Sequence, residues 1–257
     1  MIRLANANHM AMVGINYGMV ADNLPPPSKA RDLMVGMGVT KAKIYNVNTT
    51  VLKDFMGKGI SFIVGVGNEE LHGLASDVEV AMTWVKQNIE PWAPMIKAIA
   101  VGNEVLTTGD ARLIVDLMPA IMNVHTALGP LATRIVVSTP HAMSVLATPS
   151  FPPSIATFEP SIRDVVMRPL ALFLAQTGAP FMINAYPFFA YKAQPISIPL
   201  AYVLFQPNQG LPDPITGHLY YNMLDAQVFT PYYVLLVETC GNSLIFTLIV
   251  NCAQHSK

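Results

Sequence analysis

The chain has 257 residues, of which 52% are hydrophobic and 12% are charged, and its formal net charge is −1. This composition supports a large buried core and excludes an intrinsically disordered chain. The near-neutral charge also gives no basis for binding nucleic acid or an anionic membrane surface. The six histidines show no metal-ligand spacing such as HExxH, so we expect no metal and no other cofactor.

Neither the cysteines nor the first residues define the compartment of the protein. Two cysteines, Cys240 and Cys252, are too few for a disulfide framework. Asn and His residues interrupt the apolar part of residues 1–14, so no clear secretory signal is present. The most apolar stretch, Tyr232 to Cys252, contains Glu238, which favours a strand and tail over a membrane segment, the weaker alternative.

Short apolar runs alternate with longer amphipathic segments along most of the chain. The predicted helices begin near capping residues, with Ser28 for the first and Ser76 or Asp77 for the third. The predicted strands are 11–18, 41–46, 61–67, 96–104, 134–142, 180–187 and 234–238, and the predicted helices are 28–38, 48–59, 75–89, 110–128, 163–177 and 219–228.

These strands are continuous apolar runs, which is typical of parallel sheets covered on both faces. Their repeat of roughly 30 residues is that of a βαβ unit. The pattern favours an α/β fold of the TIM-type (β/α)8 barrel class over a doubly wound sheet. Because the pattern stops short of eight units, we expect a barrel that is incomplete at its C-terminal end. The expected barrel domain covers 11–238, and a divergent tail covers 239–257.

Polar and aromatic residues gather where the predicted strands end, which in a parallel barrel is the functional mouth. Two near-copies end there, SFIVGVGNEEL at 61–71 and AIAVGNEVL at 98–106. Amides can hydrogen-bond sugar hydroxyls, aromatic rings can stack on sugars, and glycosidic hydrolysis needs two carboxyl groups. The candidate sugar-binding residues at this mouth are Tyr17, Tyr45, Asn103, Asn184, Tyr186 and Phe189.

Several stretches between residues 13 and 228 carry a family resemblance: GINYGMVADNLPPPSKA, KAKIYN, VLKDFMGKGI, IVGVGNEEL, IKAIAVGNEVL, FLAQTGAPFMINAYPFFAYK, and YVLFQPNQG through NMLDAQV. In these stretches, and in their order, the chain resembles plant-type glycoside hydrolase family 17, the β-1,3-glucanases. The resemblance implies a TIM-type barrel that hydrolyses β-1,3-glucan with retention of configuration and by endo action.

The resemblance also implies different roles for the two near-copies. Glu104 matches the general acid/base, and Asn103 would position the sugar or the catalytic pair. Glu69 and Glu70 match a segment that is not catalytic, so we expect them to be a solvated carboxylate pair. The cleft aromatics of the family are matched by Tyr45, Tyr186 and Phe189.

The family nucleophile follows strand seven in an ETGWP-like motif, where this chain has VLLVETCGNS. Glu238 and Thr239 match the motif, but its Trp and Pro are missing. Only ten residues separate Gln227 from Glu238, which is short for a parallel crossover. Two alignments are therefore open. Glu238 is the nucleophile after a strand, or it lies on a helix and the chain has no nucleophile.

After Glu238 the family pattern stops, which indicates a truncated or divergent chain. Three functions are open: hydrolysis of β-1,3-glucan, binding of glucan without turnover, and an inactive fragment. The resemblance implies an extracellular or cell-wall monomer, and we expect no nucleic-acid partner and no transmembrane span. Asn48-Thr49-Thr50 is a glycosylation sequon, which is usable only if the chain enters the secretory route.

Overall fold

The computed structural model describes residues 14–147, 152–238 and 246–250. Two parallel sheets dominate it, one in the order β1-β2-β3-β4-β5 and one in the order β10-β7-β6, and a small antiparallel sheet pairs β8 with β9. The strands of the parallel sheets are β1 Ile15–Asn16, β2 Lys41–Ile44, β3 Ser61–Val66, β4 Ile96–Val101, β5 Val136–Ser138, β6 Pro140–Ala142, β7 Phe181–Ala185 and β10 Phe246–Val250.

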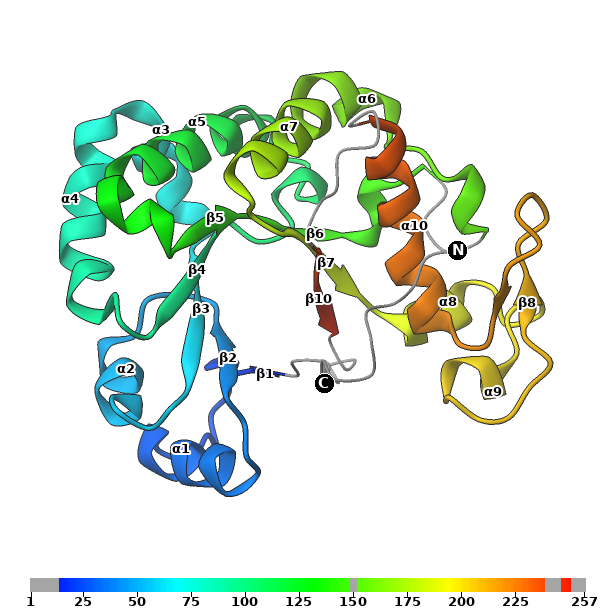
Figure 1. Cartoon of the computed structure of the whole chain (residues 1–257), viewed down its shortest axis with the longest axis horizontal. Helices are drawn as coiled ribbons and strands as arrows, with labels where there is room; N and C mark the ends of the chain where they lie inside the picture. The colour runs from blue at the N-terminus through cyan, green and yellow to red at the C-terminus, as the bar shows by residue number, and fades with distance from the viewer. Residues whose placement is uncertain (1–13, 148–151, 239–245, 251–257) are drawn as a thin grey trace.

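Thr139 links the two parallel sheets, because β5 ends at Ser138 and β6 begins at Pro140. The predicted strand 134–142 is thus divided at a proline, which has no N–H for a continuous ladder. β5 pairs with β4, whereas β6 pairs with β7. The strands form one curved arc with helices on its outer side (Figure 1), which confirms a TIM-type α/β barrel architecture. Among the described strands, no pairing joins β1 to β10, so the arc is open there.

Most helices of the outer layer follow the predicted segments. Asn48 and Asp77 cap α2 and α4 through side-chain oxygens that accept backbone N–H bonds. The prediction of Ser28 as a cap was wrong: Pro27 opens α1 and Pro26 holds the cap position, because the fixed φ of proline suits a first turn. The helices are α1 Pro27–Gly36, α2 Thr49–Phe55, α3 Leu71–Ser76, α4 Val78–Asn88, α5 Ala111–Leu128, α6 Pro160–Ile162 and, after a π-helical turn at Arg163–Met167, α7 Arg168–Thr177.

Helix α5 covers the arc through one apolar stripe and contacts α3 and α4. By length and composition alone, the segment Ala111–Thr133 is apolar enough to cross a membrane, and it is the one such segment within the described ranges. The spacing of its buried side chains is typical of an amphipathic helix that packs on a core. These buried residues are Leu117, Ala120, Ile121, Val124 and Leu128.

A smaller unit lies beside the C-terminal part of the arc (Figure 1). It has its own apolar cluster, which includes the buried rings of Tyr202 and Tyr220. The Asp213 carboxylate fixes its hairpin, since it accepts hydrogen bonds from Ser154 and from the backbone N–H groups of Ile215 and Thr216. The elements of this unit are α8 Pro187–Ala193, α9 Leu200–Val203, β8 Leu211–Pro212 and β9 Leu219–Tyr220.

The C-terminal segments differ most from the sequence-based predictions. The strand predicted at 234–238 was wrong, because these residues continue helix α10, Met223–Glu238. A short apolar run does not distinguish a strand from a buried helix by periodicity. Strand β10 lies instead in the expected tail, where it pairs in parallel with β7 from Phe246 opposite Phe181 to Val250 opposite Ala185.

Candidate active site

The loop after β4 has an unusual backbone that carries Glu104 to the mouth. Gly102 has φ of +68° and Glu104 has φ of +53°, in the left-handed region. Positive φ is rare for a residue with a side chain, and such conformations cluster at functional sites. The Glu104 N–H donates to the Pro140 carbonyl at 2.9 Å, which ties the loop to β6.

Asn184, on β7, holds the Glu104 carboxyl group directly. Its Nδ2 donates to Glu104 Oε1 at 2.5 Å and lies 3.4 Å from Asn103 Oδ1. Asn184 is 1% exposed, so its side chain is fixed by the surrounding barrel. The structure thus brings together three of the predicted site residues, and one oxygen of Glu104 is oriented by an amide donor.

Asn68, from the upstream near-copy, clamps the same loop from the other side. Its Oδ1 accepts from the Asn103 N–H at 2.8 Å, and its Nδ2 donates to the Asn103 carbonyl at 3.1 Å. Both backbone groups of Asn103 are therefore satisfied by one side chain on the neighbouring strand connection. The sequence analysis missed this role, although the repeated Gly-Asn-Glu after two adjacent strands was a usable signal.

The carboxylates of the upstream copy serve other contacts. Glu70 accepts from the Gly67 N–H at 3.2 Å and from Trp84 Nε1 at 2.7 Å. Glu69 lies so close to Gly67 that a Cβ on that glycine would overlap its carboxylate. Glu70 therefore caps and anchors the 3-10 turn Asn68–Glu70, instead of being simply solvated as predicted.

Aromatic residues follow β2 and β7, the second of which carries Asn184. Tyr45, at the end of β2, is 37% exposed, and burial together with the Glu104 charge raises the pKa of its phenol. Tyr186 and Phe189 lie with ring centroids 5.4 Å apart, and Phe189 contacts Phe188 at 5.7 Å. Phe188 was not predicted, although it adjoins Phe189 in the same motif. These rings offer apolar surfaces of the kind that stack on sugar faces.

The structure does not place two of the predicted site residues, Tyr17 and Glu238, at the mouth. Tyr17 is buried in the outer core against Phe55 of α2, with ring centroids 6.2 Å apart, which differs from its expected position at the mouth. Its side chain points outward because the neighbouring Asn16 occupies the other face of the strand. Glu238 is the last residue of α10, and its side chain lies outside the described part of the chain.

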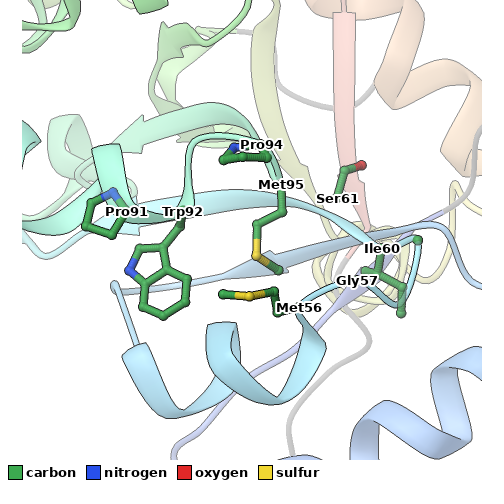
Figure 2. Close-up of a pocket in the computed structure, with 9 residues that line it drawn as sticks. Met56, Gly57, Ile60, Ser61, Pro91, Trp92, Pro94 and Met95 are labelled. Atoms are coloured by element: carbon green, nitrogen blue, oxygen red, sulfur yellow. The ribbon is translucent and has the colours of Figure 1, made fainter.

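A pocket of about 440 Å³ lies at the opposite ends of β3 and β4 (Figure 2). It includes residues that precede the two strands, and its lining has no carboxyl or amide side chain among the described residues. Its chemistry is therefore apolar and unlike that of the mouth. Nor do the described ranges contain a group of three or more His, Cys, Asp or Glu residues that could hold a metal ion. The pocket is lined by Met56, Gly57, Gly59, Ile60, Ser61, Pro91, Trp92, Pro94 and Met95.

The chain is similar to plant glucanases in sequence. Glucan endo-1,3-beta-glucosidase 11 of Arabidopsis thaliana is 46% identical over 87% of this chain and 53% of the relative. Glucan endo-1,3-beta-D-glucosidase of Olea europaea is 43% identical over 87% of this chain and 49% of the relative. The chain thus spans about half the length of these curated relatives.

Solved structures and a family model agree with this similarity. The beta-1,3-glucanase and allergen of Cryptomeria japonica pollen superposes with a TM-score of 0.85 at 40% identity, covering 91% of this chain and 73% of that one. The family model of glycosyl hydrolases family 17 matches residues 13–251, which include β10 and the Glu104 loop. The chain therefore belongs to glycosyl hydrolases family 17.

Proposed function

We propose that the protein hydrolyses O-glycosyl bonds of β-1,3-glucan, with Glu104 as general acid/base. The observation that carries the proposal is the contact of Asn184 Nδ2 with Glu104 Oε1, together with the exposed Tyr45, on whose phenol the Glu104 charge acts. The names and family of the similar proteins support the glucan as substrate.

In this mechanism Glu104 protonates the oxygen of the leaving sugar and later takes a proton from water. The amide of Asn184 occupies one carboxyl oxygen, so the other is available for proton transfer. Asn103 and the aromatic residues Tyr45, Tyr186 and Phe189 would hold the sugar ring.

Retaining hydrolysis also needs a nucleophilic carboxylate about 5 Å from the acid. Glu238 is our candidate from the sequence motif, but its place at a helix end agrees with the alignment in which it is not that nucleophile. Glu238→Gln tests the assignment: loss of turnover supports it, and unchanged turnover removes Glu238 from the mechanism.

The first experiment measures reducing-sugar release from a linear β-1,3-glucan by the purified chain. Turnover in the parent chain that is lost in Glu104→Gln supports the proposal. Glucan binding without turnover by a chain that unfolds cooperatively would contradict hydrolysis and leave a binding function. No glucan binding and no turnover would contradict both.

We further propose an extracellular or cell-wall location and a monomeric state. The glycosylation sequon at Asn48 lies at the start of α2, where its Oδ1 accepts backbone bonds and its Nδ2 is the atom that a glycan would use. Expression in plant cells tests the location: secretion of a form whose glycan shift is lost in Asn48→Gln supports it, and intracellular retention contradicts it. Light scattering tests the monomer.

A further inference from the structure

Lys43 is a buried lysine whose charge the mechanism above does not use. It lies in the middle of β2 and is 4% exposed. Its Nζ has no hydrogen-bond partner among the described residues and lies 4.2 Å from the centroid of the Tyr45 ring. Tyr45 follows β2 directly, two residues after Lys43, and the contact between them puts both side chains on the same face.

That face is the inside of the barrel. Lys43 is in register with Asn16 on β1 and Ile63 on β3, and Ile63 packs with the inner cluster that contains Ala98 and Ala100 of β4. Lys43 thus extends under the mouth, where the ring of Tyr45 covers its ammonium group.

Leaving an ammonium group buried without a hydrogen-bond partner costs free energy. A methionine would fill a similar volume without this cost, so filling space does not account for the charge. The ionisable group that acts on Lys43 is Glu104, from the loop after β4, and the register partners Asn16 and Ile63 carry no ionisable group. Burial lowers the pKa of Lys43 to about 8, while the Glu104 charge acts in the opposite direction.

We propose that Lys43 is a positioning residue of the active site, whose buried ammonium stabilises the carboxylate that Glu104 becomes when it gives its proton to the leaving oxygen. This inference rests on the proposed function. The proton moves from Glu104 to the glycosidic oxygen as the bond to the anomeric carbon breaks, and the new negative charge attracts the Lys43 ammonium. Tyr45 keeps water from the ammonium, so that the charge is weakly screened.

Two variants test the proposal against a merely structural role. Lys43→Met removes the charge and keeps the volume, and Lys43→Arg restores the charge. Lys43→Met is expected to lower kcat for linear β-1,3-glucan about tenfold with KM within twofold. Lys43→Arg is expected to return kcat to within about threefold of the parent chain. A Lys43→Met variant with kcat within twofold of the parent chain would overturn the proposal.

A second measurement needs no catalysis. The Lys43 side chain is titrated by carbon-13 NMR in the parent chain and in Glu104→Gln. The proposal expects Lys43 to lose its proton at lower pH in Glu104→Gln, because the charge that opposes burial is removed. The same titration in both chains would overturn the proposal. The titration tests the proposal on its own if Lys43→Met or Lys43→Arg does not fold. It also does so if the parent chain has no turnover and the proposed function fails.

Discussion

The two Gly-Asn-Glu segments, residues 67–69 and 102–104, follow neighbouring parallel strands yet have different backbones. Gly67 has φ of −64° and starts a 3-10 turn, whereas Gly102 and Glu104 are left-handed. In the first segment, the Asn68 side chain hydrogen-bonds both backbone groups of Asn103. The second turns Glu104 towards Asn184 and the mouth. The comparison teaches that one segment fixes the loop on which the other carries the proposed acid/base.

The largest expected difference between the two segments is in turnover. Glu104→Gln is expected to lower kcat for linear β-1,3-glucan by about 10² to 10⁴, because general acid catalysis contributes that much. Glu69→Gln in the upstream segment is the matched control, with kcat expected within about twofold. Equal losses in both variants would contradict the assignment of the acid to Glu104.

The hydrogen bonds by which the upstream segment supports the Glu104 loop can be removed by substituting Asn68. Asn68→Ala leaves the N–H and carbonyl of Asn103 without their partner, so we expect the free energy of unfolding to fall by about 1–3 kcal/mol. We also expect kcat to fall about tenfold, because Glu104 is displaced.

Asn88→Ala is the control for Asn68→Ala, since the Asn88 side chain also donates to a backbone carbonyl, that of Trp84, on helix α4. It is expected to change stability without lowering kcat. A loss of kcat in Asn88→Ala as large as that in Asn68→Ala would show that the effect is not specific to the loop.

The backbone difference can be tested with alanine at the two glycines. Gly102→Ala is expected to cost about 1–2 kcal/mol more than Gly67→Ala, because a left-handed conformation is strained for alanine. A Cβ at Gly102 would also lie 2.5 Å from Val105 Cγ2, whereas at Gly67 it would meet the movable Glu69 side chain. Urea unfolding of both variants measures the difference. Equal free energies would contradict the left-handed backbone at Gly102.

The smallest expected effect is on stability, and it tests whether Glu70 is a structural residue. Glu70→Gln weakens the hydrogen bonds from Trp84 and Gly67, so we expect a loss of about 1 kcal/mol in the free energy of unfolding. Turnover is expected to change less than twofold. Tryptophan fluorescence during urea unfolding gives the stability, and a loss of turnover greater than tenfold would place Glu70 in the chemistry after all.

The sequence determined the barrel class and most of its strands, because buried parallel strands are continuous apolar runs whose order local patterning reveals. It also placed Glu104 at a strand end and separated it from Glu69 and Glu70, through the family resemblance. Position at a strand end correctly brought Glu104 and Asn184 to one site, whereas the same reasoning misplaced Tyr17.

Only the tertiary structure decided which groups meet. The clamp of Asn68 on Asn103 and the contact of Asn184 with Glu104 join residues that follow or lie on different strands, and no local pattern encodes such contacts. The helical state of 234–238 and the pairing of β10 with β7 were decided in the same way. An apolar run suits either conformation, and its choice depends on the neighbours against which it packs.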